Sequence, residues 1–353
     1  MSSLPYLNLA SHFSQYGAFL TVCTNALLTN LTIFHVKNIS FSYKCLIGLQ
    51  AVLGIFFSLI ELLVHPFLHS FNASYIFFSA TFANEESKEW MLLGTLLLGL
   101  YSWIYMSIIC CLAIQFIYRF FVVISPKLLQ LFSGWKMITW VLYLLVFTIG
   151  WVLSLLEIYP DNFTKGYLKE EMKKNYKIDI SFLPSYQVVA ADQNGTFRSS
   201  AILGVSGFSL VIVLQYIVIM YCGVFIHSGI RSIATLSPKV HRMHSQLFKT
   251  LVLQIAVPSI FYNSPVLLMY IIIFLDLKWS APSGVMICVF SFYPAIDSFL
   301  LLWMVTEYNR TIIKLMHKLL AKIAKLLEAR AGESEDTDPT KSKKTTVSMT
   351  QFV

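Results

Sequence analysis

Charged residues are scarce in this chain, and their scarcity limits what kind of protein it can be. Of 353 residues, 12% are charged and 57% are apolar. A soluble globular domain carries about 25% charged and about 45–50% apolar residues. A soluble enzyme of this length would expose more apolar surface than its charged side chains could keep in solution. The composition therefore excludes an ordinary soluble protein and favours one that lies within a lipid bilayer.

Cysteine is absent from the long polar segments. Every cysteine lies within an apolar run, where a free thiol behaves as a small hydrophobic group. The cysteines are Cys23, Cys45, Cys110, Cys111, Cys222 and Cys288. None forms a C-x-x-C pair with metal spacing, so we expect no zinc site and no disulfide in the loops. The short apolar run behind a charged start that marks a cleavable signal peptide is also missing. The first apolar segment is therefore expected to remain as an anchor.

Sequence signatures of catalysis are missing too. The chain has no glycine-rich phosphate loop, no H-E-x-x-H zinc motif and no G-x-S-x-G nucleophile elbow. His241 and His244 lie close in sequence but lack a third metal ligand. We therefore expect no enzyme activity, no cofactor, no metal site and no nucleic-acid partner.

Long apolar runs are what the chain does contain. About 20 apolar residues are needed for a helix to cross a hydrocarbon core of ~30 Å. In lipid only helices and closed barrels satisfy the backbone, and these runs are too long and too continuously apolar for barrel strands. The sequence therefore predicts an all-α fold, a seven-transmembrane helix bundle. The predicted spans are Tyr16–Val36, Cys45–Val64, Trp90–Ile117, Met137–Leu156, Ala201–Ile226, Leu251–Leu275 and Pro282–Val305.

The distribution of basic residues predicts the orientation. Basic residues in short loops mark the cytoplasmic side, whereas long loops are translocated largely regardless of charge. Alternate short loops hold Lys37, Lys44, Arg119, Lys127, Lys136, Arg231, Lys239, Arg242 and Lys249, against Lys88 and Lys278 in the others. This bias predicts an outer amino terminus and a cytoplasmic tail. The glycosylation triplets that begin at Asn72, Asn162 and Asn194 then fall outside.

The domain organisation follows from the same pattern. We expect a transmembrane domain over 1–305, with an outer loop at about 158–200 that mixes charges with aromatic residues. This loop is predicted to fold as a cap, although a mobile solvated loop is the alternative. Apolar residues at helical spacing, interleaved with lysines, predict a basic amphipathic helix over 306–330. It is expected to lie on the anionic inner leaflet, with calmodulin or another protein partner as the alternative. The polar segment 331–353 is expected to be disordered.

A few polar or helix-breaking residues interrupt the apolar runs. Charges in a bilayer are costly and usually face the bundle interior. Glu157 is expected to reach the interface, Glu61 to line a ligand cavity or meet headgroups, and Asp297 to be paired or hydrated inside the bundle. Pro258 and Pro294 free backbone groups within the sixth and seventh predicted spans and are predicted to act as hinges, with a static kink at each as the alternative.

Five short motifs, in order and each at a predicted helix end, give the chain a family resemblance. They are Asn30-Leu31 through Tyr43-Lys44-Cys45-Leu46, His65-Pro66 through His69-Ser70, Gln115-Phe116-Ile117-Tyr118-Arg119-Phe120, Gln246-Leu247-Phe248-Lys249-Thr250-Leu251 continuing to Gln254 and Pro258, and Ser291-Phe292-Tyr293-Pro294-Ala295-Ile296-Asp297. The chain resembles the nematode serpentine chemoreceptors, most closely the Str-type branch of the seven-helix G-protein-coupled receptors. It departs from the family pattern at Phe120, where Tyr is usual, and at Ser298, where Pro is frequent.

The resemblance implies a chemosensory, olfactory-type receptor that binds a small external ligand and activates a heterotrimeric G protein. It implies a plasma-membrane location, in sensory cilia. Arg119 would lie at the G-protein face, with Pro294 and Asp297 in the helix-seven switch. The expected coupling residues are Tyr118, Arg119, Arg231, Lys239 and Arg242. The expected ligand-binding residues are Tyr101, Trp103, Tyr105, Tyr262, Asn263 and Tyr270.

A multi-pass transporter or a ligand-gated channel is the alternative function. Transporters often carry internal repeats with paired broken helices, and the two halves of this chain have no convincing similarity. A channel needs a ring of charges or carbonyls as its selectivity element, and no such run stands out.

Overall fold

Helices dominate the structure, a computed structural model that describes residues 4–36, 39–83, 85, 87–233, 238–277 and 285–336. Within these ranges, the side chains of 4, 232–233, 239–240, 285–287 and 328–336 are not described. Among the described residues, six helical stretches are long and apolar enough to cross a membrane, or seven if a strongly bent helix pair near the carboxyl end is counted as one span.

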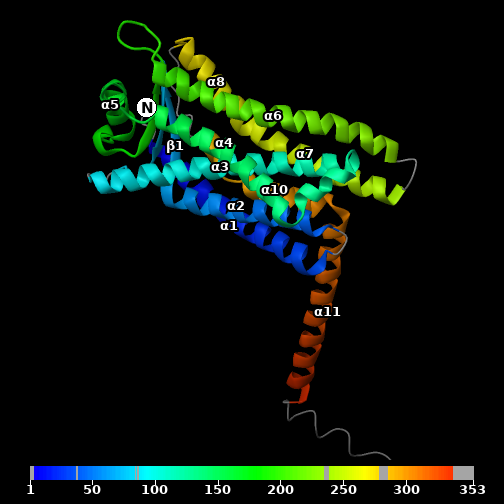
Figure 1. The fold of residues 1–353 in the computed structure, drawn as a ribbon. Coiled ribbons are helices and arrows are strands. Elements are labelled where there is room, and N and C mark those ends of the chain that lie inside the picture. Colours follow the sequence, from blue (N-terminus) through cyan, green and yellow to red (C-terminus); the bar gives the residue numbers. More distant parts are fainter. Residues whose placement is uncertain are drawn as a thin grey trace, which may run out of the picture.

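The spanning helices run side by side and form one elongated bundle (Figure 1). In chain order they are α1 (Leu4–Asn30, continued by the π-turn η1, Leu31–His35), α2 (Phe41–Val64), α3 (Lys88–Val123), α4 (Ile138–Glu157), α6 (Ser199–Ile233), α7 (Pro238–Pro258) with the π-turn η5 (Ser259–Asn263) and α8 (Ser264–Phe274), and α9 (Val285–Phe290) with α10 (Tyr293–Met304). The predicted spans match these helices, although the expected start of the seventh, Pro282, lies outside the described residues.

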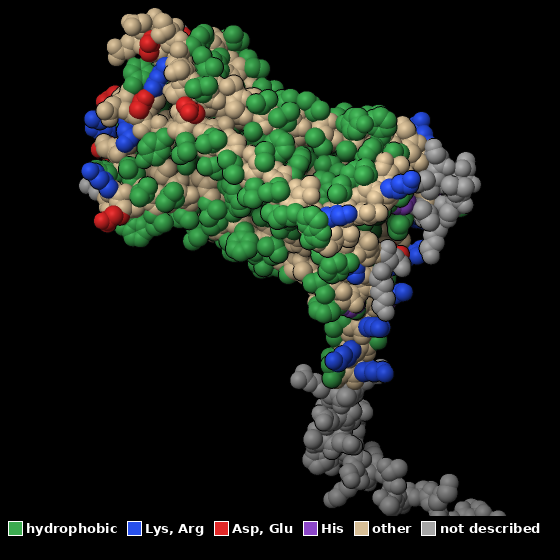
Figure 2. Space-filling model, in the orientation of Figure 1, with side chains coloured by type: hydrophobic (Ala, Val, Ile, Leu, Met, Phe, Trp, Pro, Cys, Tyr) green, Lys and Arg blue, Asp and Glu red, His purple; other side chains and the backbone are tan. Residues whose placement is uncertain are grey.

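Helix α3 lies at the centre of the bundle. Its side chains are apolar on nearly all sides, which is typical of a helix surrounded by others, and α2, α4, α6 and α7 pack against it. The peripheral helices instead direct many large apolar side chains outward. Figure 2 shows the result: apolar side chains cover the middle of the bundle, and charged ones gather at its two ends. Such a surface suits a lipid environment.

A small antiparallel sheet corrects the all-α expectation. Its strands are β1 (Pro66–Phe71), β2 (Ser74–Ser79) and β3 (Ser185–Val189), in the order β1-β2-β3. The segment between α2 and α3 is rich in aromatic and β-branched residues, which favour strands. It also turns at Asn72, whose φ of 49° is a left-handed value that asparagine tolerates. A run this short cannot cross a membrane, and it pairs with the chain that follows α4 instead.

The sheet and the chain between α4 and α6 together form a folded cap, defined here as residues 66–79 and 158–198. Helix α5 (Asn162–Tyr176) and the turn η4 (Ile180–Phe182) complete it. Asp161 and Thr164 start α5 with a reciprocal capping box. The cap core is formed by Phe67, Ile76, Phe78, Leu168, Met172, Tyr176, Ile178, Ile180 and Leu183. We call this end of the bundle the cap end.

The opposite end carries short turns and one long helix. The turns η2 (Pro126–Phe132) and η3 (Gly134–Met137) connect α3 to α4. Helix α11 (Thr306–Asp336) leaves the bundle after α10, with an angle of 85° between the two helices. It contains the predicted amphipathic segment and continues into the segment that was expected to be disordered, of which 337–353 lie outside the described residues. Figure 1 shows α11 running across the direction of the bundle.

Candidate functional site

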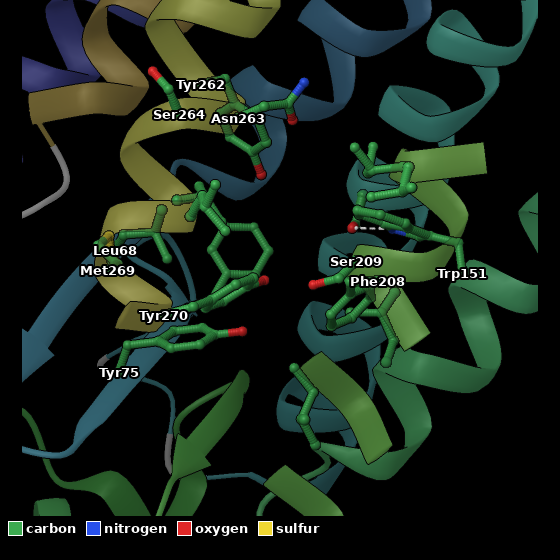
Figure 3. Close-up of a pocket in the computed structure, with 18 of the residues that line it drawn as sticks. Leu68, Tyr75, Trp151, Phe208, Ser209, Tyr262, Asn263, Ser264, Met269 and Tyr270 are labelled. Atoms are coloured by element: carbon green, nitrogen blue, oxygen red, sulfur yellow. Dashed lines mark hydrogen bonds between the residues drawn. The ribbon is translucent and has the colours of Figure 1, made fainter. Parts of the chain in front are cut away.

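A cavity of about 360 Å³ lies inside the bundle next to the cap. It is bordered by α3, α4, α6 and the η5–α8 segment, and strands β1 and β2 form its roof. Figure 3 shows Tyr262, Tyr270 and Tyr75 on one side, facing Phe208, Ser209 and Trp151 on the other. The lining residues are Leu68, Tyr75, Phe77, Ser102, Trp151, Leu155, Ile158, Phe208, Ser209, Ile212, Val213, Tyr216, Ser259, Tyr262, Asn263, Ser264, Val266, Leu267, Met269 and Tyr270.

None of these lining side chains is charged. The wall is mostly aromatic and aliphatic, with a few hydroxyl groups and the amide of Asn263. One polar wall group is already engaged, because the indole Nε1 of Trp151 donates to Ser102 Oγ at 2.8 Å. An ion placed here would be poorly compensated, since burying an unpaired charge is far more costly than burying a neutral group that finds a hydrogen bond.

A chain of hydrogen bonds beside the cavity connects α3, the π-turn η5 and α6, and each donor in it points the same way along the chain. The Tyr105 hydroxyl donates to Asn263 Oδ1 at 2.6 Å, and Asn263 Nδ2 donates to the Tyr216 hydroxyl at 2.9 Å. Tyr216 lies 2.5 Å from Ser259 Oγ, which itself donates to the Ile255 carbonyl at 2.5 Å. Because Ser259 has one proton to give, Tyr216 must donate to it. We call Tyr105, Asn263, Tyr216 and Ser259 the polar relay.

The π-turn η5 explains how the relay residues meet. Pro258 has no backbone N–H and its ring crowds the preceding turn, so the regular helix cannot continue unchanged. The chain widens into a π-turn over Ser259–Asn263, a feature often found at functional sites. The turn presents Ser259 and Asn263 to Tyr216 on α6, and it places the Tyr262 ring 4.7 Å from that of Tyr105.

The predicted ligand residues divide into two groups in the structure. Tyr262, Asn263 and Tyr270 line the cavity, whereas Tyr105 lies behind Asn263 as part of the polar relay. Tyr101 is buried and stacks on Phe57 with ring centroids 4.4 Å apart. Trp103 packs against the main core and is not among the lining residues.

Several residues that line the cavity were not predicted from the sequence. Trp151 and Leu155 come from α4, Phe208 and Ser209 from α6, and Tyr75 from β2. Hydroxyl residues inside apolar runs, such as Ser209, were a usable signal for a cavity wall. The roof had no such signal, because it depends on the pairing of strands that the sequence did not predict.

The second break in the bundle lies between α9 and α10. Asn25 of α1 donates to the Pro294 carbonyl at 3.4 Å and accepts from Ser298 at 2.5 Å. The Asp297 carboxyl is buried, with the side chains of Gln50 and Gln254 beside it. The predicted switch residues Pro294 and Asp297 therefore lie in a polar cluster that joins α1, α2, α7 and α10.

The other acidic residues differ in their surroundings. Glu61 is buried beneath the cap and accepts a hydrogen bond from Ser291 at the α9–α10 break. It does not line the 360 Å³ cavity. Glu157 is exposed at the end of α4.

His69 and Asp161 are among the cap residues whose pKa is shifted, and both bear on the contacts of α5. Burial lowers the pKa of His69 below its ordinary 6.5, against the opposing pull of the Glu171 charge. His69 Nε2 lies 3.2 Å from Glu171 Oε1, and Nδ1 lies 3.0 Å from the Tyr176 hydroxyl. Burial acts to raise the pKa of Asp161, but hydrogen bonds from Thr164 and Arg198 outweigh it and hold that pKa low. Both contacts join α5 to neighbouring parts of the cap end.

At the far end of α3, Arg119 is buried rather than extended toward solvent. Its guanidinium carbon lies 3.9 Å from the centroid of the Tyr43 ring and 5.8 Å from that of Tyr118. The two tyrosine rings stack at 5.1 Å, and the Tyr118 hydroxyl lies 2.5 Å from Ser40 Oγ. Within the described part of the chain, Arg119 makes no ion pair. Tyr43 and Tyr118 therefore hold the guanidinium by ring contacts.

The other predicted coupling residues lie at the same end. Arg231 and Arg242 are exposed, and the side chain of Lys239 lies outside the described residues. Arg231 also borders a second cavity of about 550 Å³, together with Lys249 and two histidines. The predicted glycosylation residues Asn72, Asn162 and Asn194 all lie at the cap end, at the β1–β2 turn, the start of α5 and the turn that follows β3.

Comparisons with known proteins agree with this architecture. The model of the family described as "Serpentine type 7TM GPCR chemoreceptor Str" matches residues 10–313. The chain is 35% identical to the G-protein coupled receptor str-33 of Caenorhabditis elegans over 308 residues, 84% of this chain and 88% of that receptor. It is 26% identical to serpentine receptor class r-10 of the same organism over 323 residues, 90% of this chain and 93% of that receptor.

The structure is also similar to that of squid rhodopsin, with a TM-score of 0.54 over 91% of this chain and 83% of that chain. At 13% identity this likeness shows the fold alone. The prediction of the family from five motifs is confirmed, and with it the expectation of a multi-pass membrane protein without enzyme activity. The chain belongs to the Str family of serpentine, seven-transmembrane, G-protein-coupled chemoreceptors of nematodes.

Proposed function

We propose that this receptor binds a small, neutral external molecule in the 360 Å³ cavity and activates a heterotrimeric G protein at the Arg119 end. One observation carries the proposal: a single central helix, α3, borders both places. Ser102 lines the cavity and Tyr105 supports its wall, while Arg119 lies more than three turns further along the same helix. A movement of α3 against its neighbours would therefore affect both ends.

The cavity supports a particular class of ligand. Its volume is at the lower end of the ~300–1,000 Å³ typical of small-molecule sites. An apolar wall with hydroxyl and amide groups suits a mainly hydrocarbon molecule with one or two hydrogen-bonding atoms. Ions are disfavoured because none of the lining side chains that the structure describes supplies a countercharge.

Ring contacts connect the cavity to the break between α9 and α10. Tyr262 stacks on Phe290 at 4.5 Å, and Phe290 lies parallel to Tyr293 at 5.4 Å. Tyr293 is followed by Pro294 and the cluster around Asp297. A ligand that shifts Tyr262 would act on this stack, and through it on the hinge that the α9–α10 break and Pro258 provide.

The coupling end is closed in this conformation. Arg119 lies beneath Tyr43, so a G protein could reach it only after the ring contacts are released. Arg231, Lys239 and Arg242 would then supply additional positive charge to the partner. Removal of the contact with Tyr43 is thus the activating event in this proposal.

We further infer that the cap end faces outward at the plasma membrane, including the membrane of sensory cilia. The basic bias of the loops and the grouping of all three glycosylation triplets at the cap end support this orientation. Helix α11 would then lie on the inner leaflet, with Lys314, Lys318 and Lys322 near the anionic headgroups. A further glycosylation triplet, Asn309-Arg310-Thr311, lies at the opposite end, in α11. Sugar attached at Asn309 but not at the cap end would contradict the orientation.

The test of coupling is nucleotide exchange on a G protein, measured for the receptor in lipid nanodiscs against a panel of small neutral volatiles and charged metabolites. Arg119→Ala should keep surface expression and lose ligand-stimulated exchange. Tyr43→Ala should raise basal exchange by releasing Arg119. Tyr43→Phe is the matched control, because it keeps the ring, and the hydroxyl of Tyr43 has no hydrogen-bond partner in the described part of the chain. Normal coupling by Arg119→Ala would refute the proposed coupling site.

A further inference from the structure

The cap closes the cavity from above. Leu68 of β1 and Tyr75 of β2 are buried and line the roof. The Tyr75 and Tyr270 rings lie 5.9 Å apart and join this roof to α8. The strands themselves are paired along their length, and β3 and α5 cover them further. A molecule arriving from the aqueous side of the cap would meet this closed layer.

One side wall of the cavity is open instead. Val213 on α6 and Leu267 on α8 both line the cavity, and 52% and 56% of their surfaces are exposed. Ser264, at the start of α8, lines the cavity and is exposed as well. Side chains that face both the cavity and the outside mark a passage between α6 and α8. We call this passage the side window.

Two contacts limit the window along the helices. Toward the middle of the bundle, the hydrogen bond between Tyr216 and Ser259 joins α6 to the π-turn at 2.5 Å. Toward the cap, the rings of Phe197 and Phe274 lie 5.9 Å apart, just before α6 and at the end of α8. Between these contacts the two segments leave the cavity accessible from the side.

The surface around the window is apolar. Leu210 and Ile217 on α6 are 59% and 57% exposed, and Leu268 and Ile271 on α8 are 50% and 46% exposed. These residues lie within two of the stretches that are apolar enough to span a membrane. The window therefore opens into lipid hydrocarbon and not into water.

From this arrangement we propose that ligands enter and leave the receptor through the bilayer, by the side window between α6 and α8. The proposal rests on the cavity being the ligand site, as proposed above. It narrows the ligand class to neutral molecules that partition into lipid before they bind. Each added methylene raises the concentration of such a molecule in the membrane about fourfold, so sensitivity should follow lipid solubility among ligands that fit.

The experiment follows the chemical accessibility of the cavity in the full-length receptor, held in lipid nanodiscs that expose both faces. Ser209 points into the cavity (Figure 3), and Ser209→Cys places a thiol there. Two probes are compared: N-phenylmaleimide, which is neutral and lipid-soluble, and 2-sulfonatoethyl methanethiosulfonate, which is anionic and confined to water. Labelling of this one site is read by peptide mass spectrometry, and each rate is normalised to that of a free thiol.

The neutral probe should label this thiol at least tenfold faster than the anionic probe. Adding Val213→Trp should slow the neutral probe about tenfold by filling the window, and Leu267→Trp should do the same from the other side. Leu214→Trp is the matched control, since it is an exposed neighbour on α6 that does not line the cavity. It should leave the rate unchanged.

Three results would overturn the proposal: equal normalised rates for the two probes, no labelling by either probe, or no slowing in either tryptophan variant that remains folded. The labelling needs neither a ligand nor a G protein. A receptor that labels as expected but never stimulates nucleotide exchange would therefore refute the proposed function and leave the lipid route standing.

Discussion

Removal of one hydroxyl group from the polar relay should make the receptor more active without ligand. The Tyr216 hydroxyl accepts from Asn263 Nδ2 at 2.9 Å and lies 2.5 Å from Ser259 Oγ. Through these contacts the Tyr216 hydroxyl joins α6 to the π-turn η5. Tyr216→Phe keeps the ring in the cavity wall and removes both of these contacts. If activation separates α6 from the π-turn, this substitution weakens only the closed state.

The size of the effect can be worked from those bonds. Loss of the acceptor leaves the amide donor of Asn263 unsatisfied, at a cost of about 1–3 kcal/mol. Ser259 keeps its own bond to the Ile255 carbonyl, so it adds little. A closed state destabilised by about 1–3 kcal/mol shifts the closed–open equilibrium by a factor of about 5–150. Basal nucleotide exchange should rise by the same factor while the open fraction remains small.

The assay is ligand-free nucleotide exchange by a purified G protein, with the receptor at equal surface density or equal amount in nanodiscs. Tyr221→Phe is the matched control: it lies on the same helix, is 57% exposed, and its hydroxyl makes no hydrogen bond within the described residues. It should leave basal exchange unchanged. Unaltered basal exchange and unaltered thermal stability in Tyr216→Phe would show that the relay does not hold the closed state.

Two further predictions concern packing and pH. Gly17→Ala should lower the melting temperature measured with a thiol-reactive dye, because the new Cβ would lie 2.6 Å from the Ser291 backbone oxygen and such overpacking costs about 1–3 kcal/mol. Gly48→Ala, where nothing lies within 4 Å, should be neutral or stabilising, and equal behaviour of the two would contradict the tight contact. Acidification should loosen the cap: burial lowers the pKa of His69, so the stability it contributes is complete above 6.5 and is lost as pH falls through the folded pKa. The protection factors of the β-strand amides, which correct for the intrinsic slowing of exchange in acid, should thus fall as the pH drops below 6.5, and His69→Gln should flatten that dependence.

The sequence predicted the helices well because the signal for a membrane span is strong. A lipid-facing helix must be apolar along its whole length, and each predicted span lies within or largely overlaps a described helix. The ends of the helices were predicted less accurately than their middles. Helix α1 begins at Leu4, well before the predicted Tyr16. Its first turns pack on the cap core through Leu7, Ala10 and Phe13, whereas Asn8, His12 and Gln15 are exposed, so these turns lack a continuous apolar run.

The cap could not be predicted in detail from one sequence. The strands β1 and β2 pair with each other across a short turn, but β3 comes from a segment roughly a hundred residues later. Such pairing depends on which surfaces meet after the helices assemble, and local propensity does not report it. The cavity roof depends on that pairing, so Tyr75 was missed although Tyr262 and Tyr270 were predicted.

Arg119 shows a different limit of sequence interpretation. Its motif predicted its place at the end of α3 but not its burial, since an arginine at a helix end can extend to the interface as easily as it can turn inward. The deciding residue, Tyr43, lies on the neighbouring helix. The centroid of its ring lies 3.9 Å from the guanidinium carbon of Arg119.

The nature of this contact matters for what a small ligand can achieve. A buried salt bridge typically costs about 3–5 kcal/mol to break by loss of one partner, whereas a cation–π contact contributes about 0.5–2 kcal/mol. Arg119 is held by ring contacts with Tyr43 and Tyr118 and by no ion pair among the described residues.

To change an open–closed ratio from 1:99 to 99:1, a ligand must favour the open state by about 5.5 kcal/mol. The best small ligands gain about 0.3–1.5 kcal/mol per heavy atom in all, and only part of that can differ between states. A closed state held by weak contacts of this kind, at Arg119 and in the polar relay, remains within reach of a molecule that fits a 360 Å³ cavity; one held by a buried ion pair would not.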